Sequence, residues 1–273
     1  MSPTRRHRLI LLAVLLLVLP LGVVAWGGRS EAPTTSTALA PSTTTTVTST
    51  PAKKVLLLGD SSMVDASPAL IAMFNASGAQ VAMGAIPGYG LTQVGMSMPT
   101  SPFRSDWVRL RDQETPDLVV VMLGLWDQHF VEVNGVATYS RIVTEAADIL
   151  TAKGAKVLWL SLPPGGKAPE RIQDPAFEAV AAMYPGKVFY TDTEGSLRGP
   201  NGDFPARYVA PDGSLVHLRK ADGWHFCPDG AERLADAVDR VSVNDGLTVP
   251  AMDGWQNGPW RVSSLYDEPA CSQ

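Results

Sequence analysis

The sequence contains only two cysteines, no nucleotide-binding glycine motif and no excess of basic residues. Two cysteines with scattered histidines lack the ligand spacing of a zinc site. There is no P-loop, and Gly84, Gly88 and Gly90 have the wrong spacing for a dinucleotide fingerprint. We therefore expect neither a metal nor a cofactor.

Positive charge is scarce in the main part of the chain. Four of the 22 basic and one of the 27 acidic side chains precede residue 53, which leaves 18 basic and 26 acidic side chains and a net charge of −8. Phosphate binding needs a basic surface, so this balance argues against nucleic acid as a partner but not against a neutral glycan. The length and the normal apolar content predict one ordinary globular domain with additional segments.

The N-terminus has the pattern of a membrane segment. Arg5, Arg6 and Arg8 precede an uncharged apolar run over residues 9–26, which is just long enough to span a bilayer. The basic flank predicts that this end stays cytoplasmic and that the body is exported. We interpret residues 1–29 as a membrane anchor. The alternative is a signal segment cleaved near Ala38-Leu39-Ala40, which would give a secreted protein.

Composition changes again after the apolar run. Residues 30–52 are dominated by Thr, Ser, Pro and Ala, with too few large apolar groups to fold. This stretch predicts a disordered linker. We place the folded domain at 53–245 and interpret 246–273 as a tail packed on it, because Trp255 and Trp260 lie in otherwise irregular sequence. A glycan-stacking surface is the functional alternative for these tryptophans.

The body alternates strand-like and helix-like segments. Continuous Val/Leu-rich runs separated by helical patterns indicate a parallel sheet covered on both faces, hence a three-layer α/β/α sandwich with five mainly parallel strands. Strands are expected at 54–58, 80–85, 116–123, 156–160 and 187–190, and helices at 68–77, 138–153, 169–183 and 231–243. Ligands bind outside the carboxyl ends of such strands.

Two motifs at opposite ends of the domain contain the residue types that nucleophilic catalysis uses, although alone the first is more often an ordinary turn and the second a loop histidine bonded to a nearby backbone group. Ser61 follows the first strand in Gly59-Asp60-Ser61, at a turn where free helix amides favour negative charge. Asp222 precedes His225 by three residues, on a loop before the last helix. A carboxylate, an imidazole and a serine hydroxyl form a catalytic triad when the fold brings them together.

This order of motifs resembles the first and last sequence blocks of the SGNH/GDSL hydrolase family. The stretch from Gly84 to Thr92 resembles the second block, whose glycine donates a backbone N–H to the oxyanion; Gly88 is the best match and Gly90 the second. The resemblance covers about 53–243 and implies a flavodoxin-like sheet. It further implies Ser61 as nucleophile, His225 as base, Asp222 as its partner, and an oxyanion hole that includes the N–H groups of Ser61 and Gly88.

The third block departs from the usual pattern. Family members carry Gly-x-Asn-Asp, whereas this chain has Gly124-Leu125-Trp126-Asp127. Loss of one oxyanion donor typically costs ~10²–10³ in rate. Either the indole N–H of Trp126 replaces the amide, or the hole has backbone donors alone, or the site is inactive. The Gly-x-Trp-acid version resembles a bacterial branch that includes SGNH-like domains attached to membrane acyltransferases.

The resemblance implies an exported serine esterase or acyltransferase acting on O-acyl, in particular O-acetyl, groups of envelope glycans or on small esters. A membrane acyltransferase is a candidate partner. The alternative is a catalytically inactive SGNH-fold module that binds an envelope glycan or a partner protein. In an exported protein Cys227 and Cys271 are expected to form a disulfide. His217 and His129 are interpreted as solvent-exposed.

Overall fold

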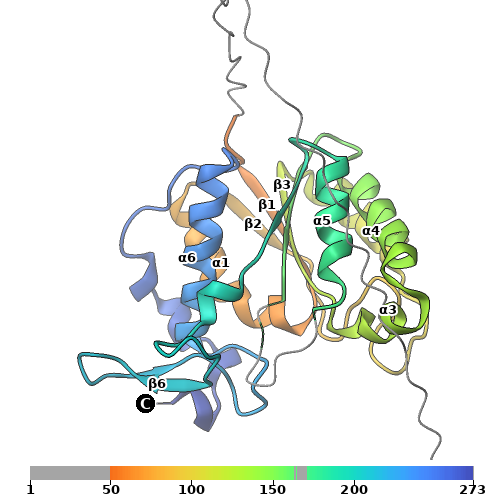
Figure 1. Ribbon diagram of the computed structural model, residues 1–273. Coiled ribbons are helices and arrows are strands. Elements are labelled where there is room, and N and C mark those ends of the chain that lie inside the picture. Colours follow the sequence, from red (N-terminus) through yellow and green to blue (C-terminus); the bar gives the residue numbers. More distant parts are fainter. Residues whose placement is uncertain (1–49, 163, 165–170, 273) are drawn as a thin grey trace, which may run out of the picture. The chain divides into compact units, whose positions relative to one another are not determined.

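The computed structural model describes residues 50–162, 164 and 171–272. Five parallel strands form one sheet in the order β2-β1-β3-β4-β5 (Figure 1). They are β1 (Lys54–Gly59), β2 (Gln80–Met83), β3 (Leu118–Met122), β4 (Lys156–Leu160) and β5 (Val188–Thr191). The order reverses between β1 and β3, and this is the place in a doubly wound sheet where ligands bind.

Helices cover both faces of the sheet. One face carries α1 (Ser61–Ala76) and α6 (Pro228–Asn244), and the other carries α2 (Phe103–Glu114), α4 (Val136–Thr151) and α5 (Asp174–Met183) (Figure 1). A short helix, α3 (Gln128–Asn134), follows the turn after β3. The predicted three-layer α/β/α sandwich is confirmed.

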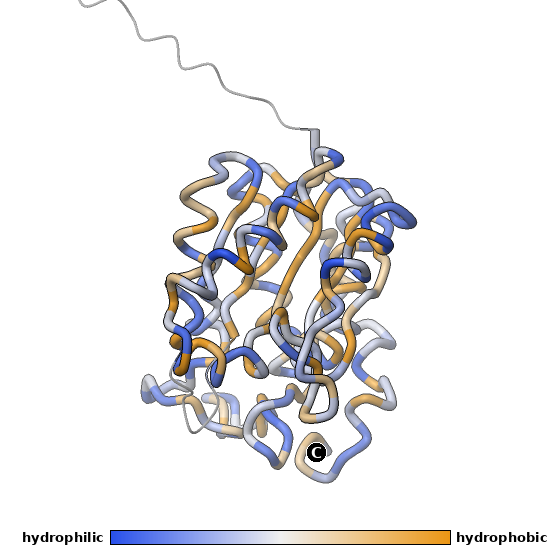
Figure 2. Tube along the Cα trace, turned by 90° about the vertical axis from the view of Figure 1, so that its right-hand side faces the viewer, coloured by the Kyte–Doolittle hydropathy of each residue, from blue (hydrophilic) through white to orange (hydrophobic). Residues whose placement is uncertain are grey.

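Each strand supplies both cores because side chains alternate across the sheet. Leu57 belongs to the cluster under α1 and α6, and Leu56 and Leu58 belong to the cluster under α2, α4 and α5. Figure 2 shows these hydrophobic strands in the middle of the domain. The continuous apolar runs of the sequence follow from this two-sided burial.

The first helix begins earlier than residue 68, so the expected boundary is wrong. Asp60 caps α1 by accepting from the N–H of Ser62 at 2.9 Å, which starts the helix at Ser61. Pro68 lies inside the helix and cannot donate to the carbonyl of Val64. The hydroxyl of Ser67 donates to that carbonyl instead, at 2.7 Å, so the helix continues through the proline.

Several elements are absent from the sequence prediction. Helix α2 buries only Phe103 and Trp107, so its apolar stripe is too narrow to stand out in the sequence. A hairpin of β6 (Arg207–Val209) and β7 (Leu215–His217) consists of strands too short to give a periodic signal.

His217 ends β7 and is only 4 % exposed. Its Nδ1 lies 2.7 Å from the carbonyl oxygen of Ala270, so the surface interpretation of this histidine is wrong.

The C-terminal residues fold back onto α1 and α6. Four 3-10 turns follow α6: η3 (Trp255–Asn257), η4 (Pro259–Val262), η5 (Ser264–Tyr266) and η6 (Pro269–Cys271). Trp255, Trp260 and Tyr266 are buried in the core beside α1. Their rings are therefore not exposed as a stacking surface for a glycan.

The predicted disulfide is present. Cys227 and Cys271 are joined with their Cα atoms 5.1 Å apart. The bridge attaches the tail to the residue that precedes α6.

The predicted anchor at 1–29 and nearly all of the linker at 30–52 lie outside the described residues. Among the helices of the described ranges, none is long and apolar enough to cross a membrane.

Candidate active site

The turn between β1 and α1 holds Ser61 at the carboxyl edge of the sheet. Gly59 ends β1 beside β3, and a Cβ at this position would lie 2.1 Å from the carbonyl oxygen of Met122. Only glycine permits this close approach. Ser61 is then the first residue of α1, where the backbone N–H groups have no partner within the helix.

Asp60 organises this turn. The side chain is fully buried, its Oδ1 accepts from the N–H of Ser62, and its Oδ2 accepts no hydrogen bond from the described residues. The pKa of Asp60 is raised to about 7, mainly by burial. The charge of Asp127 contributes to the rise, and the hydrogen bonds from Ser62 oppose it. A carboxyl group directly before Ser61 thus titrates near neutral pH.

The glycine-rich loop after β2 lies beside this turn. Ile86 donates to the carbonyl of Gly59 at 3.0 Å, which attaches the loop to the end of β1. Gly88 has a left-handed backbone (φ +83°), and in the described part of the chain its N–H donates to no acceptor. The N–H of Gly90 already donates to Gln93 at 2.9 Å. The geometry favours Gly88 over Gly90 as an oxyanion donor.

Trp126 lies next to Gly88. A Cβ built on Gly88 would be 4.0 Å from Cε2 of the indole. Trp126 is partly buried in the short 3-10 turn η1 (Leu125–Asp127), and its Nε1 makes no hydrogen bond with the described residues. The indole N–H is therefore available as a donor next to the Gly88 loop.

Asp127 joins the second and third blocks. Its carboxylate accepts from the N–H of Leu91 (3.0 Å), the N–H and hydroxyl of Thr92 (2.8 and 2.6 Å) and the hydroxyl of Tyr139 (2.8 Å). Burial raises the pKa of Asp127, and these hydrogen bonds oppose the rise. Gly90 packs so closely on this carboxylate that a Cβ would lie 2.7 Å from Oδ1. Asp127 thus fixes Gly88 relative to Trp126.

Asp222 and His225 form a hydrogen-bonded pair on the loop before α6. Oδ2 of Asp222 lies 2.5 Å from Nδ1 of His225, and Oδ1 accepts from the N–H of His225 at 3.0 Å and that of Trp224 at 2.8 Å. Burial raises the pKa of Asp222, but the hydrogen bonds from His225 and Trp224 outweigh it and hold the pKa below its ordinary value. An ionised carboxylate on Nδ1 leaves Nε2 of the imidazole as the proton acceptor.

The fold brings these groups to one edge of the sheet. Asp60 precedes Ser61, and both His225 and Asp127 are close enough to Asp60 to influence the pKa of its carboxyl group. No hydrogen bond joins Ser61 to His225 in the described ranges. Catalytic hydrogen bonds are often long in a free enzyme and shorten when substrate binds. His129, in contrast, lies on α3 with its side chain 81 % exposed, near Glu132.

Two charged residues beside the site were not identified from the sequence. Asp65 follows Ser61 by one helical turn, and Lys220 lies in the loop that leads to His225. The four-residue spacing of Ser61 and Asp65 places both on one face of a helix, but only a helix prediction starting at Ser61 could have used it.

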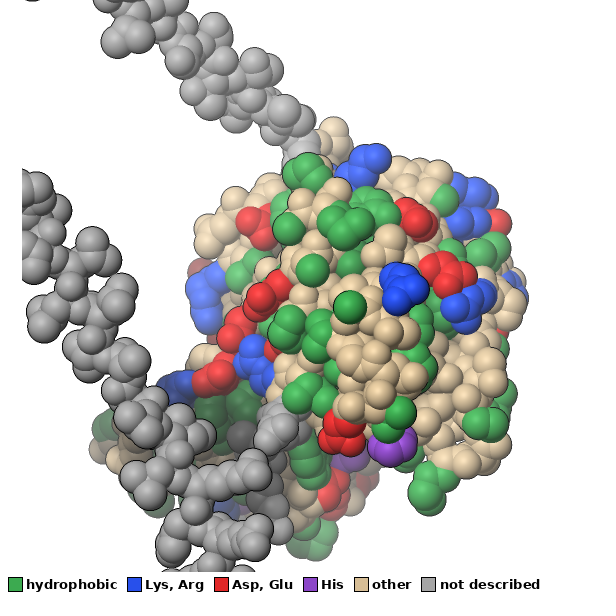
Figure 3. All heavy atoms as spheres, turned by 45° about the vertical axis from the view of Figure 1, so that its right-hand side comes forward, with side chains coloured by type: hydrophobic (Ala, Val, Ile, Leu, Met, Phe, Trp, Pro, Cys, Tyr) green, Lys and Arg blue, Asp and Glu red, His purple; other side chains and the backbone are tan. Residues whose placement is uncertain are grey.

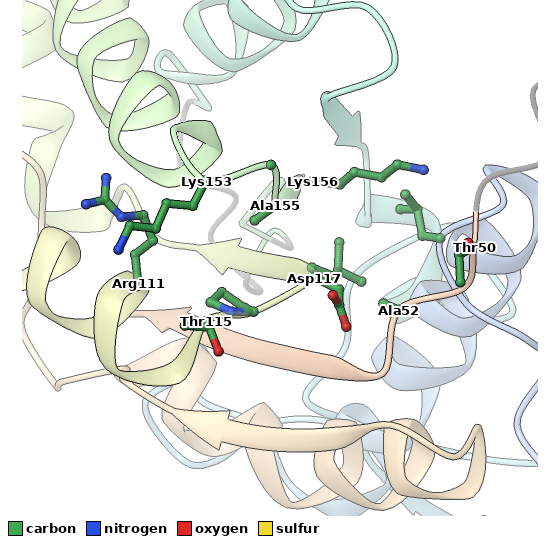
Figure 4. Close-up of a pocket in the computed structure, with 12 residues that line it drawn as sticks. Thr50, Ala52, Arg111, Thr115, Asp117, Lys153, Ala155 and Lys156 are labelled. Atoms are coloured by element: carbon green, nitrogen blue, oxygen red, sulfur yellow. The ribbon is translucent and has the colours of Figure 1, made fainter.

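A well-formed cavity lies at the opposite edge of the sheet. It has a volume of about 420 Å³ and is lined by residues that include Thr50, Asp117 and Lys156, at or before the first residues of strands (Figure 4). It contains none of the predicted site residues. No group of three or more His, Cys, Asp or Glu side chains in the described part of the chain is placed to hold a metal ion.

Comparison with solved structures finds the same fold in other proteins. TesA is 23 % identical, with 70 % of this chain and 99 % of that chain covered and a TM-score of 0.51. The periplasmic domain of a lipopolysaccharide acetyltransferase from Salmonella ser. Paratyphi A is 11 % identical, with coverage of 70 % and 84 % and a TM-score of 0.52. A search of curated proteins finds no match.

A comparison with protein families matches residues 54–241 to the family described as "Protein of unknown function (DUF459)". This match covers all the blocks on which the resemblance to the SGNH/GDSL hydrolases rests, and that resemblance is confirmed. The chain belongs to the DUF459 family.

Proposed function

We propose that the protein is a serine esterase or acyltransferase in which Ser61, His225 and Asp222 form the catalytic triad. The observation that carries the proposal is the hydrogen-bonded Asp222–His225 pair at the sheet edge where Ser61 begins α1. A histidine with a purely structural role needs only one hydrogen-bond partner. Here Nδ1 of His225 contacts a carboxylate, and a serine lies at the N-terminus of a helix at the same edge of the sheet.

The chemistry follows from these roles. The hydroxyl oxygen of Ser61 attacks the ester carbonyl while Nε2 of His225 takes the hydroxyl proton, and the carbonyl oxygen becomes an oxyanion. Asp222 stabilises the imidazolium. Collapse of the intermediate breaks the ester C–O bond, and His225 protonates the departing alcohol. A water molecule or a sugar hydroxyl then attacks the acyl-enzyme, and His225 takes its proton and returns it to Ser61.

Three N–H groups are assigned to the oxyanion. The backbone N–H groups of Ser61 and Gly88 are not used by other acceptors in the described residues, and the indole N–H of Trp126 lies beside Gly88. A preorganised donor of this kind contributes about 2.7–4 kcal/mol to the transition state. The replacement of the family's Asn by Trp therefore retains one donor at this position.

The substrate we propose is an O-acyl group, in particular O-acetyl, of a cell-envelope glycan. The N-terminal sequence favours export, and one protein of the same fold is the periplasmic domain of a lipopolysaccharide acetyltransferase. On the face in Figure 3, Lys and Arg side chains are interspersed with acidic and hydrophobic ones, which suits a neutral sugar better than a polyanion.

A fluorophosphonate probe tests the proposal. The full-length chain is incubated with the probe and the modified residue is located by mass spectrometry. We expect label on Ser61 that is lost in Ser61→Ala and in His225→Ala. His129→Ala is the matched control, because this exposed histidine lies outside the site, and it should label like the wild type.

The second candidate is an inactive binding module, which the Trp126 replacement favours. Absence of label in a folded wild-type protein, together with binding of an acylated glycan, would support this alternative. Release of free acetate from an acetylated glycan would support hydrolysis, and a new acylated sugar in the presence of an acceptor would support transfer.

A further inference from the structure

An ion pair joins α1 to the loop that carries His225. Nζ of Lys220 lies 2.9 Å from Oδ2 of Asp65, and the two side chains are 14 % and 7 % exposed. Asp65 lies on the Ser61 face of α1, one turn after Ser61. The N–H of Lys220 donates to the carbonyl of His225 at 2.8 Å. Each partner of the pair is thus adjacent to one of the two residues that exchange a proton in the proposed reaction.

The pair is well shielded from water. Burial raises the pKa of Asp65, and the charge of Lys220 opposes the rise. The carbonyl of Asp65 also accepts from the hydroxyl of Tyr266 at 2.8 Å, which fixes this turn of α1 against the tail. A shielded pair is strongly coupled, because removal of one partner leaves an uncompensated buried charge.

Apart from the backbone of Phe226, which also lies beside the Asp65 carboxylate, the other contacts of the His225 loop lead to other parts of the domain. Arg219 donates to the carbonyl of Trp224 within the loop and to that of Pro164 at 2.7 Å. The N–H of Ala221 donates to Glu268 of the tail at 3.0 Å. These contacts shape the loop, whereas the Lys220 side chain connects it to the helix that begins with Ser61.

We propose that Asp65 and Lys220 are positioning residues that hold the His225 loop against the first turns of α1 and thereby set the distance from Nε2 of His225 to the Ser61 hydroxyl. This inference rests on the proposed function of Ser61 and His225. The pair carries no net charge, so it attaches the loop without adding charge beside the imidazole.

The charges around His225 give the inference a specific signature. The ring pairs with Asp222 of its own loop, and the charges of Asp60, which caps α1, and Asp65 interact electrostatically with it. Arg219 and Lys220 are the cations of the same loop, and Glu268 of the tail accepts from the N–H of Ala221. In Asp65→Asn the Lys220 ammonium loses its carboxylate, and an uncompensated cation disfavours the imidazolium. The pKa of His225 should therefore be lower in Asp65→Asn than in the wild type.

The test combines two measurements on the full-length chain. Carbon-13 labelling of the histidines allows NMR titration of each ring, with His225→Gln to assign the resonance. The rate at which a fluorophosphonate labels Ser61 is measured in parallel. Circular dichroism establishes that each variant is folded. The variants are Asp65→Asn, Lys220→Met and Lys220→Arg, and Lys187→Met is the control for loss of an exposed lysine.

We expect Lys220→Met to lower the labelling rate on the order of 10- to 100-fold, because small misplacements of a catalytic group have effects of this size. Lys220→Arg keeps the charge and should recover most of the loss. An unchanged His225 pKa in Asp65→Asn, or labelling of Lys220→Met at the wild-type rate, overturns the inference. If Ser61 of the wild type is not labelled but the His225 pKa still falls in Asp65→Asn, the proposed function is wrong, whereas the placement of the Asp65–Lys220 pair beside His225 is supported.

Discussion

At the scale of single residues, Trp126 is the third donor of the oxyanion hole that we propose. Its ring lies against Gly88, and its N–H makes no hydrogen bond within the described residues. Trp126→Phe keeps the ring and removes the donor, so we expect the rate of Ser61 labelling or ester turnover to fall by about 10²-fold. Trp126→Asn restores an amide donor and should retain much of the activity.

Trp107→Phe is the matched control for this substitution, because Trp107 is a residue of α2 that is buried in the core between this helix and the sheet. Equal activity of wild type and Trp126→Phe would remove the indole from the mechanism and leave a hole built from backbone donors alone.

Asp60 gives the protein a pH-dependent stability. Its pKa rises from 3.8 to about 7 in the folded state because the side chain is buried. The folded protein then binds more protons than the unfolded chain between these values, so the stability falls as the pH rises through this window. The loss is at most about 4 kcal/mol, complete above pH ~7.

Asp60→Asn tests this linkage, because asparagine is an equally good helix cap but does not titrate. Denaturant unfolding at pH 5 and pH 8 should show a smaller loss of stability in Asp60→Asn than in the wild type. An identical pH dependence in both proteins would show that the Asp60 carboxyl is ionised throughout. Asp212→Asn, at an exposed turn, is the control.

At the scale of elements, Asp127 connects the turn after β3 to the loop after β2 and to α4. In Asp127→Ala the N–H groups of Leu91 and Thr92 and the hydroxyl of Tyr139 lose their acceptor. We expect a loss of about 3 kcal/mol or more in the free energy of unfolding. Tyr139→Phe removes a single donor and should cost about 1–2 kcal/mol.

Probe labelling separates the local from the global effect of these variants. Because Asp127 fixes Gly88 relative to Trp126, Asp127→Ala should label Ser61 more slowly than Tyr139→Phe even below its unfolding transition. Equal stability of the two variants would contradict the role assigned to Asp127.

At the scale of the whole molecule, the disulfide attaches the tail beside the His225 loop. It joins residues 44 positions apart, and a closed loop of this length constrains the unfolded chain by about 4 kcal/mol. The double variant Cys227→Ser, Cys271→Ser should lose stability of that order in denaturant unfolding. Reductant should destabilise the wild type to the same degree and leave the stability of the double variant unchanged. A much smaller loss of stability in the double variant would mean that Trp255, Trp260 and Tyr266 hold the tail on the domain without the disulfide.

The sequence by itself determined the layered architecture, because two-sided burial of parallel strands requires continuous apolar runs such as residues 55–58. It also identified the candidate triad and the Asp222–His225 spacing, because these depend on residue type and local separation. It misplaced the start of α1, since a proline at position 68 conceals a helix whose cap lies at Asp60.

Only the tertiary structure decided what depends on contacts between distant segments. The Lys220–Asp65 pair, the four donors to Asp127 and the burial of His217 each join residues that nothing in the linear order connects. The resemblance already ranked Gly88 above Gly90, and the structure adds the physical reason, because the N–H of Gly90 donates to the carbonyl of Gln93. Local patterns specify elements and motifs, whereas burial and pairing across the fold set the geometry and the charge of the site.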